Sequence, residues 1–231
     1  EQANAMFEEI KAMADDDSTA FVYAGILEAQ GEIEQAAVEY QLCIDNSTDD
    51  SIRLAAYREL SELYQLQREK EPALVNQEID ILLSMQRAFP NEEEAFVFER
   101  LGEAYFAKGV LTGEESDFQD AINSFQSLIS LGYGRASTYL NIAIIQQRLL
   151  RYADAEATLL ELLDLYPRNG EACIQMAFLI AEREGKKAQN ERDYEPVMDY
   201  YQLAVECGAS GQNLQRLEGV ISDLRSGGWI N

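Results

Sequence analysis

The side chains that could carry chemistry in this chain are mainly carboxylates. Carboxylates in clusters can hold a hard cation or act as an acid and base pair. The clusters are Asp15, Asp16 and Asp17; Asp45, Asp49 and Asp50; and Glu92, Glu93 and Glu94. Each cluster, however, lies just before or at the start of a predicted helix. A carboxylate there accepts hydrogen bonds from free backbone N–H groups and opposes the positive end of the helix dipole. We therefore expect these clusters to stabilise helix starts.

Residues 45–56 come nearest to a metal-binding motif. The run from Asp45 to Asp49 resembles the start of a calcium-binding loop, but it lacks the central glycine, and Ala56 stands where the last glutamate ligand belongs. The chain has no histidine, which removes the Ser-His-Asp and Cys-His types of nucleophilic catalysis. It also lacks a glycine-rich phosphate-binding motif. We expect no catalytic, cofactor-binding or metal-binding residue, and therefore neither an enzyme nor a need for a cofactor.

The cysteines are few and scattered. Cys43, Cys173 and Cys207 form no CxxC motif, and an odd, widely spaced set is neither a disulfide framework nor a zinc site. Free cysteine behaves as a small hydrophobic residue. We expect all three in or near the core.

The net charge of −24, from 42 acidic and 18 basic residues, excludes two classes of partner. Nucleic acid requires a basic stripe, and an anionic membrane surface requires a basic one too. No apolar run is long enough for a membrane span, and the first residues do not follow the plan of a signal peptide. Two interpretations of the acidic surface stay open, namely a solubilising surface and a groove that attracts basic peptides.

A small residue followed four positions later by a bulkier one recurs along the chain. The small members lie 33, 37, 48, 34 and 42 residues apart, which is close to the period of a repeated helical hairpin. A small residue allows two antiparallel helices to approach closely. The pairs are Ala3/Phe7, Ala36/Tyr40, Ala73/Gln77, Ala121/Phe125, Ala155/Leu159 and Val197/Tyr201.

Residues 136–169 form the clearest unit, with two apolar helical segments and a proline, Pro167, that ends the second. In another unit, the segment 101–105 reads Leu-Gly-Glu-Ala-Tyr and matches an L-G-x2-Y pattern. On these features the chain resembles the tetratricopeptide repeat (TPR) family over about residues 3–207. The tryptophan that opens the family's pattern is absent. In its place stand Tyr57, Phe98, Tyr139 and Cys173.

The resemblance implies an all-α fold, a right-handed TPR superhelix of antiparallel helix pairs with a C-terminal capping helix. We expect one solenoid over residues 1–231. Residues 1–16 would be the second helix of a truncated repeat. The expected repeats are 17–50, 51–91, 92–134, 135–169 and 170–209, followed by a capping helix at 210–226 and a tail at 227–231.

Two insertions interrupt the expected period. We interpret residues 110–117 and 185–193 as surface loops between the helices of their repeats, and their function stays open. Both are expected at the same edge of the array, because insertions in repeats map to one face. In the tail, Trp229 and Ile230 either fold back onto the capping helix or form an exposed contact point.

The family's geometry places the first helix of each repeat on the concave face. The residues that would line this groove are Phe21, Arg58, Glu62, Glu99, Glu103, Phe106, Leu140, Asn141, Ile144, Arg148, Ile174 and Phe178. Apolar and aromatic residues with acidic ones between them suit a peptide or protein with hydrophobic anchors and some basic side chains. The alternative is that several of these apolar residues pack against neighbouring repeats.

Three roles follow. The first is a non-catalytic scaffold that binds a peptide or protein in the groove. The second is the regulatory or sensor region of a larger signalling enzyme, because residues 217–224 and 227–230 are similar to the ends of TPR regions appended to bacterial serine/threonine kinases. The third is self-association. We expect a cytoplasmic location, and a place outside the cytoplasm behind an upstream membrane anchor is the alternative.

Overall fold

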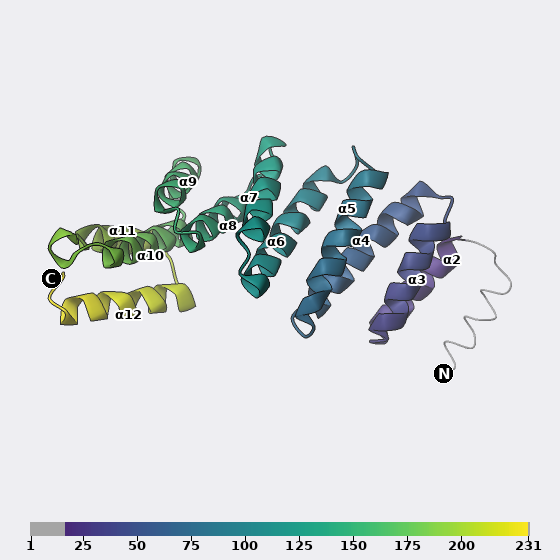
Figure 1. The fold of residues 1–231 in the computed structure, drawn as a ribbon, viewed down its shortest axis with the longest axis horizontal. Coiled ribbons are helices and arrows are strands. Elements are labelled where there is room, and N and C mark those ends of the chain that lie inside the picture. Colours follow the sequence, from purple (N-terminus) through teal and green to yellow (C-terminus); the bar gives the residue numbers. More distant parts are fainter. Residues whose placement is uncertain (1–16, 231) are drawn as a thin grey trace. The chain divides into compact units, whose positions relative to one another are not determined.

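The computed structural model describes residues 17–230, and every regular element in that range is a helix. The helix predicted within residues 1–16 lies outside the described residues. Figure 1 shows the helices in chain order. They are α2 (Asp17–Ala29), α3 (Ile33–Asn46), α4 (Asp50–Gln67), η1 (Pro72–Leu74), α5 (Val75–Ala88), α6 (Glu94–Thr112), α7 (Glu115–Ser130), α8 (Ala136–Arg148), α9 (Tyr152–Leu165), α10 (Gly170–Lys186), η2 (Gln189–Glu191), α11 (Glu195–Glu206) and α12 (Gln212–Ser226).

The chain divides into two compact units, residues 1–124 and residues 125–231. The division falls within α7, and we describe each unit by itself. Across the described part of the chain, no helix combines the length and the apolar character that crossing a membrane requires.

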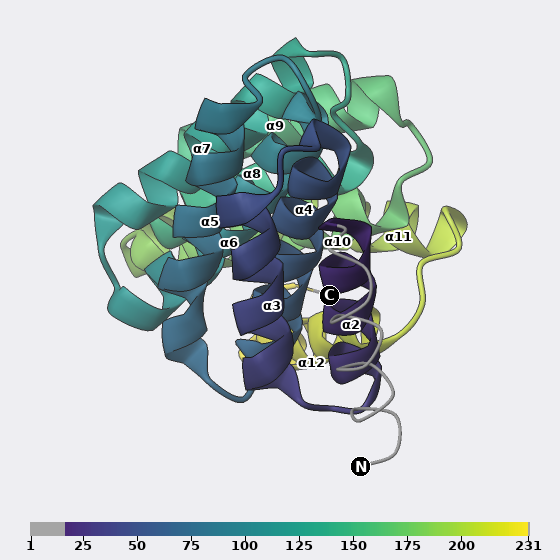
Figure 2. The ribbon, with the colours of Figure 1, turned by 90° about the vertical axis from the view of Figure 1, so that its right-hand side faces the viewer.

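In unit 1, each helix from α2 to α6 packs against the next one along the chain. Contacts also join α2 directly to α4, and Figure 2 shows α3 to one side of these two helices, so α2 and α4 form one layer and α3 belongs to a second. Small residues lie where the layers meet, and Ala24, Ala36 and Ala56 are completely buried. Around them pack larger core residues such as Tyr40 and Leu60. The small residues thus allow the close approach that the sequence pattern predicts.

One of the predicted small–bulky pairs is wrong. Ala73 and Gln77 are both exposed, and the buried pair is Val75 with Ile79. The reason is the 3-10 turn η1, which begins at Pro72 and precedes α5. Because this turn has a different pitch from an α-helix, the inward face of α5 starts two residues later than the sequence pattern indicates.

In unit 2, α8 packs on α9, α9 on α10, and α10 on α11, while α12 packs on both α10 and α11. Ala155, Ala172 and Ala177 are buried at the helix contacts. The tail folds back onto α12, since the backbone N–H of Trp229 donates to the carbonyl oxygen of Leu224 at 2.9 Å, and the Trp229 ring also meets that of Tyr194, just before α11, edge-on at 5.6 Å. Of the two alternatives for Trp229, the folded-back position is therefore the one observed.

The predicted loop at residues 110–117 is wrong. Val110 belongs to the last turn of α6 and Asp117 to the first turn of α7, and only residues 113 and 114 connect the two helices. The extra residues lengthen the helices because both ends are stabilised. Gly113 ends α6 with a φ of 76°, and the Asp117 carboxylate accepts a hydrogen bond from Thr112 at 2.8 Å and pairs with Lys108 at 3.0 Å.

The second predicted loop begins later than expected, because α10 continues through Lys186. The connection that follows is held by the buried carboxylate of Glu184. It accepts a hydrogen bond from the Asp193 backbone N–H at 3.0 Å and lies 2.8 Å from the Lys187 ammonium group. The connection is therefore fixed to α10 rather than freely projecting.

The predicted helix caps are confirmed at one cluster and wrong at another. Asp49 is the N-cap of α4 and accepts a hydrogen bond from the Ser51 backbone N–H at 2.8 Å. Glu93 precedes α6 in the left-handed conformation, with a φ of 53°, and its side chain makes no cap. It binds Arg58 instead, at 3.2 Å. Asp15 and Asp16 lie outside the described residues.

Candidate functional site

The predicted groove residues of unit 1 lie on α2, α4 and α6. Phe21 on α2 is half-buried, and its ring is tilted against that of the core residue Tyr40 at 5.7 Å. This contact ties Phe21 to its own hairpin. Phe21 therefore packs within its own repeat, and this contact does not test the alternative that these residues pack against neighbouring repeats.

Arg58 on α4 is held in place by residues of two helices. Its guanidinium lies 3.6 Å from Glu62 and 3.2 Å from Glu93. It also lies over the ring of Phe96 on α6, at 4.6 Å from the ring centre. Since the side chains are 46% and 43% exposed for Arg58 and Glu62, this pairing adds little stability. It does set the charge pattern of the surface between α4 and α6.

Glu103 on α6 connects the same surface to the interior of unit 1. Its carboxylate accepts a hydrogen bond from Gln65 on α4 at 3.0 Å and lies 3.6 Å from Arg100. Burial raises the pKa of Glu103, and the charge of Arg100 opposes that effect. Glu62 and Glu99 are half-buried on the same helices.

Below this surface lies a buried charge cluster that the sequence analysis missed. The carboxylate of Glu78 on α5 is fully buried, and it lies 2.7 Å from Arg68 and 3.4 Å from Arg100. Burial raises the pKa of Glu78, and the two guanidinium groups act to lower it. A signal for the cluster existed, because Glu78 and Arg100 are charged residues at positions that belong to the apolar faces of their helices.

Beside Phe106, the end of α6 forms an apolar groove with the end of α4 and with η1. One cavity there, of about 510 Å³, is lined by Gln65, Arg68, Glu103, Phe106, Ala107 and Val110. A second, of about 410 Å³, is lined by Arg68, Glu69, Pro72, Val75, Ala107, Val110 and Leu111. The two cavities share Arg68, Ala107 and Val110, so they form one feature, which we call the α6-end groove.

Two apolar residues of the α6-end groove are open to solvent. Val110 and Leu111 are each 53% exposed. Phe106 is half-buried, and its ring packs against that of Phe118, with 6.2 Å between the ring centres. The residues that the sequence analysis assigned to a loop thus supply an apolar surface on a rigid helix. Exposed apolar surface with a polar rim is typical of a protein-binding site.

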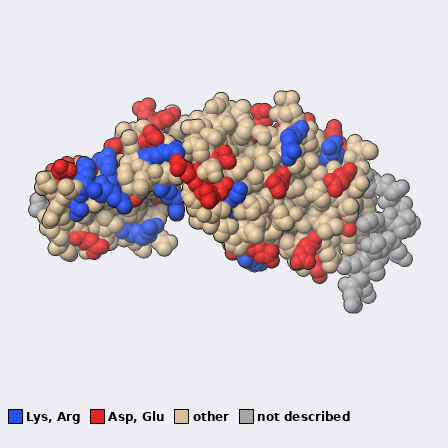
Figure 3. Space-filling model, in the orientation of Figure 1, with Lys and Arg blue, Asp and Glu red and all other residues tan. Residues whose placement is uncertain are grey.

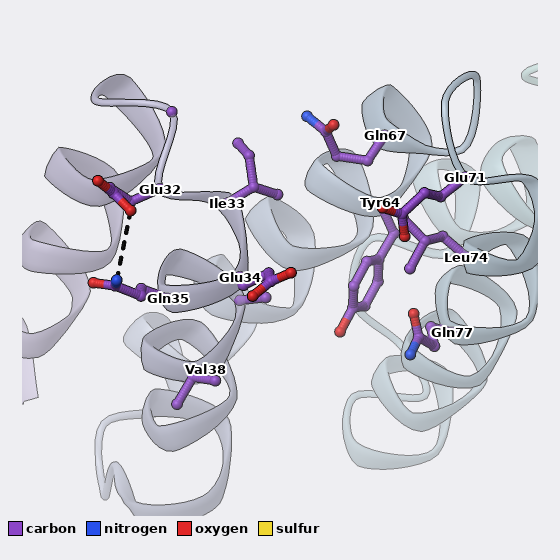
Figure 4. A pocket seen from close by; sticks show the side chains of 12 residues that line it. Glu32, Ile33, Glu34, Gln35, Val38, Tyr64, Gln67, Glu71, Leu74 and Gln77 are labelled. Atoms are coloured by element: carbon purple, nitrogen blue, oxygen red, sulfur yellow. Dashed lines mark hydrogen bonds between the residues drawn. The ribbon is translucent and has the colours of Figure 1, made fainter.

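A larger and more polar cavity, of about 620 Å³, lies between α3 and the segment that joins α4 to α5. Its walls carry the carboxylates Glu32, Glu34 and Glu71 and the amides Gln35, Gln67 and Gln77. Figure 4 shows Glu34 and Tyr64 extending into the space between the two sides, above Val38. Gln35 bonds Glu32 at 3.5 Å. Among the described residues that line this cavity none is basic, so their field favours a positively charged group.

The predicted groove residues of unit 2 lie on α8 and α10. Ile174 is wrong as a groove residue, because it is completely buried in a core cluster to which α12 contributes Leu217 and Ile221. Phe178 is half-buried, and the guanidinium of Arg216 on α12 lies over its ring at 5.6 Å. The capping helix α12 therefore contributes both to the core around Ile174 and to the surroundings of the Phe178 ring.

The remaining predicted residues of unit 2 are on the surface of α8. Leu140, Asn141 and Ile144 are half-buried, and Arg148 is exposed. Between α8 and α10 runs a polar network in which Gln147 donates to Glu182 at 2.6 Å and accepts from Gln175 at 2.7 Å. The surface of α8 therefore carries hydrogen-bonding side chains as well as the apolar residues Leu140 and Ile144.

Charge is distributed unequally between the units. Residues 1–124 contain 28 of the 42 acidic residues and 8 of the 18 basic ones. Residues 125–231 hold the other 14 acidic and 10 basic residues. Figure 3 shows Lys and Arg side chains gathered over α10 and α11 on the face in view. The strong negative charge is therefore a property of unit 1 above all.

No family model matches the sequence, and no curated protein matches it either. Solved structures do match the fold. YrrB, a TPR protein described as having an unusual peptide-binding site, is 14% identical with a TM-score of 0.62, and the match covers 92% of this chain and 97% of YrrB. The chain has the TPR fold. The predicted fold class is thereby confirmed.

Other TPR structures are similar to the same extent. MamA is 16% identical with a TM-score of 0.62, over 83% of this chain and 91% of MamA. The C-terminal part of a TPR repeat-containing protein from Cytophaga hutchinsonii is 13% identical with a TM-score of 0.66, over 89% of this chain and 73% of that structure. Structural similarity at such low sequence identity establishes the TPR fold of the chain and nothing about its partner, which is argued from the chain's own surface.

Among residues 17–230, no cluster of acidic or cysteine side chains is suited to hold a metal ion.

Proposed function

We propose that this TPR array is a non-catalytic scaffold that binds a protein or peptide through unit 1. The observation that carries the proposal is the α6-end groove, where Val110 and Leu111 present apolar surface beside the half-buried ring of Phe106. Buried apolar anchors supply most of the energy at protein interfaces. An apolar side chain of the partner would occupy this groove.

The partner's other expected feature is basic character. The rim of the α6-end groove carries Glu69 and Glu103, and the basic residue Arg68 there is paired with Glu78. Unit 1 as a whole is strongly acidic. Complementary charge speeds association and selects among partners more than it adds affinity. We therefore propose a partner segment with an apolar anchor flanked by lysine or arginine.

The wider groove stays part of the proposal. In unit 1 it includes Arg58, Glu62 and Glu99 together with Glu103 and Phe106. In unit 2 the candidates that remain are Leu140, Asn141, Ile144, Arg148 and Phe178. Each unit is proposed to bind by its own face, and nucleic acid is not expected as a partner because of the acidic charge.

A peptide-binding experiment tests the proposal. Fluorescein-labelled peptides carrying a leucine anchor between lysines are titrated with the whole chain, and anisotropy is recorded at low and high salt. The comparison peptides replace leucine with serine or lysine with glutamate. We expect the peptide with leucine and lysines to bind and the two comparison peptides not to bind. Its binding should weaken at high salt because exposed charges are screened.

Variants then locate the site. Val110→Ser with Leu111→Ser should weaken binding about tenfold or more, the effect of losing about 1.4 kcal/mol. The matched control is Leu160→Ser, which changes a leucine of similar exposure on α9 in the other unit. Equal loss in both variants, or no loss in either, would show that the α6-end groove is not the binding site.

The alternative role, as the regulatory region of a larger signalling enzyme such as a bacterial serine/threonine kinase, stays a prediction. It rests on the similarity of residues 217–224 and 227–230 to the ends of such regions. Sequencing the native reading frame upstream of Glu1 tests it directly. A kinase domain there would support the regulatory role, and a frame without one would remove it. Self-association is tested separately by the mass of the chain in solution across a range of concentrations.

A further inference from the structure

Two of the three cysteines meet in the tertiary structure, although they are far apart in sequence. Cys173 lies in the first turn of α10, and Cys207 directly follows α11. The two helices form one hairpin, joined at the other end by residues 187–194. Cys173 and Cys207 therefore both lie at the open end of the hairpin. Burial, and after it the influence of Cys207, raises the pKa of the Cys173 thiol.

Independent contacts show how closely the chain segments approach here. A Cβ atom added to Gly170 would lie 2.9 Å from the Cβ of Ala209 and 3.3 Å from the carbonyl oxygen of Ala204. Residues 204–209, which include Cys207, are thus packed against the first turn of α10. A disulfide requires Cβ atoms that are close and directed toward each other. The close packing of these two segments brings the two cysteines near enough to be joined by side-chain rotation.

We propose that Cys173 and Cys207 form a reversible disulfide, an oxidation site that closes the open end of the α10–α11 hairpin. The oxidant is a hydroperoxide. The Cys207 sulfur attacks one peroxide oxygen, the O–O bond breaks, and the products are a Cys207 sulfenic acid and water or an alcohol. The Cys173 sulfur then attacks the Cys207 sulfur, its proton leaves with the hydroxyl group as water, and the S–S bond forms. Two electrons pass from the two sulfurs to the peroxide.

The environments of the two thiols assign their roles. Cys173 is completely buried, and burial raises the pKa of its thiol to about 11, so it does not react with an oxidant in solution and gives up its proton only as it attacks the Cys207 sulfenic acid. Cys207 is partly exposed. An oxidant in solution therefore meets Cys207 first, and Cys173 is the resolving residue. Cys43 lies in unit 1 and takes no part.

The bond would act on the stability of unit 2. A disulfide that closes a loop removes conformations from the unfolded chain. Cys173 also belongs to the core cluster that α12 completes through Leu217 and Ile221. Oxidation would therefore hold the last helix pair, and the surface on which α12 packs, in the folded arrangement. This site is separate from the α6-end groove and does not depend on the proposed binding function.

Thiol counting by mass spectrometry tests the proposal on the whole chain. The chain is treated with hydrogen peroxide, unfolded, and alkylated with N-ethylmaleimide. The reduced chain should take three maleimide groups, one for each cysteine, and the oxidised chain one. Proteolysis should then yield a cross-linked peptide containing Cys173 and Cys207, and a thiol reductant should release it.

Matched variants complete the test. Cys43→Ser should still form the cross-link, and Cys207→Ser should not. Oxidation should raise the thermal midpoint of unfolding of the wild type and of Cys43→Ser by several degrees, and should leave that of Cys207→Ser unchanged. Three outcomes would overturn the proposal. They are full alkylation after peroxide treatment, a Cys207 sulfinic acid with Cys173 still alkylated, and a dimer linked through Cys207.

Discussion

The Nη1 atom of Arg68 lies 2.7 Å from the carboxylate of Glu78 in the interior of unit 1. Arg100 approaches the other carboxylate oxygen at 3.4 Å, and Glu78 itself is fully buried. Arg68 directly follows α4, Glu78 lies in α5 and Arg100 in α6, so one carboxylate joins the end of α4 to the next two helices. A buried charge without its partner is far more costly than the pair. The cluster therefore favours one packing of these helices over others.

Removing the central carboxylate should be strongly destabilising. We expect Glu78→Ala to lower the free energy of unfolding by about 3–5 kcal/mol, because two guanidinium groups lose their shared partner. Arg58→Ala breaks ion pairs that are largely exposed, so its cost should be at most about 1 kcal/mol. Urea unfolding of both variants provides the measurement. Equal losses would contradict the role assigned to Glu78.

The stability of unit 1 should depend on pH through the same carboxyl group. Burial raises the pKa of Glu78 above its ordinary value. A carboxyl group whose pKa is higher in the folded state binds its proton more tightly there. Its contribution to stability is fully present below the unfolded pKa and is lost as pH rises through the folded pKa. We expect the wild type to gain stability relative to Glu78→Gln as pH falls from about 7 to about 5.

Glu184 in unit 2 should behave in the opposite way. Burial acts to raise its pKa, but hydrogen bonds from Lys187 and from the Asp193 backbone outweigh this effect, and the pKa is lowered. Its contribution is present above the unfolded pKa and is lost as pH falls through the folded pKa. The advantage of the wild type over Glu184→Gln should therefore shrink below about pH 4.5. The same sign for both variants would refute the two assignments.

Two glycines in helices should respond to alanine in opposite directions. A Cβ atom at Gly109 in α6 would lie 2.8 Å from a ring carbon of the buried Phe118. Gly109→Ala should therefore cost about 1–3 kcal/mol through overpacking. At Gly219 in α12, the space for a Cβ is empty, so Gly219→Ala should gain about 0.4–1 kcal/mol. Thermal unfolding of both variants measures the contrast, and a gain at Gly109 would contradict the close contact.

Trp229 is the one tryptophan of the chain, and it reports on unit 2. Its ring packs on Tyr194 and lies under the guanidinium of Arg192 at 5.5 Å. Tyr194→Ala should shift the tryptophan emission to longer wavelength and lower the stability of unit 2 by about 3 kcal/mol, because a buried ring is lost. Tyr166→Ala, at an exposed position, serves as the control and should change neither quantity.

The sequence was sufficient for the fold class because helix pairing in repeats leaves local marks. Ala36, Ala121 and Ala155 open recurring small–bulky pairs, and all three are completely buried. Asp49 precedes α4 and caps it, as its position predicts. These features depend on a residue's own helix and on the next one along the chain. Local periodicity and capping chemistry are therefore enough to predict them.

Other features depended on which helices meet in space. The helical period identified the inward face of α5, but the turn at Pro72 moved it by two residues. Val110 and Leu111 appeared to be a loop, and the Thr112 and Asp117 contacts made them part of α6. Ile174 followed the stripe of its own helix, yet α12 supplies residues to the core cluster that buries it. Adjacent segments decided the first two outcomes, and a helix far along the chain decided the third.

The sequence alone determines that the chain is an acidic array of helical hairpins, because small and apolar residues repeat at the spacing that antiparallel helices require. Only the tertiary structure decided that Glu78 joins three helices, that Cys173 meets Cys207, and that the end of α6 forms an apolar groove. Such pairings join residues from different helices. Their energies depend on burial and distance, which no period in the sequence encodes.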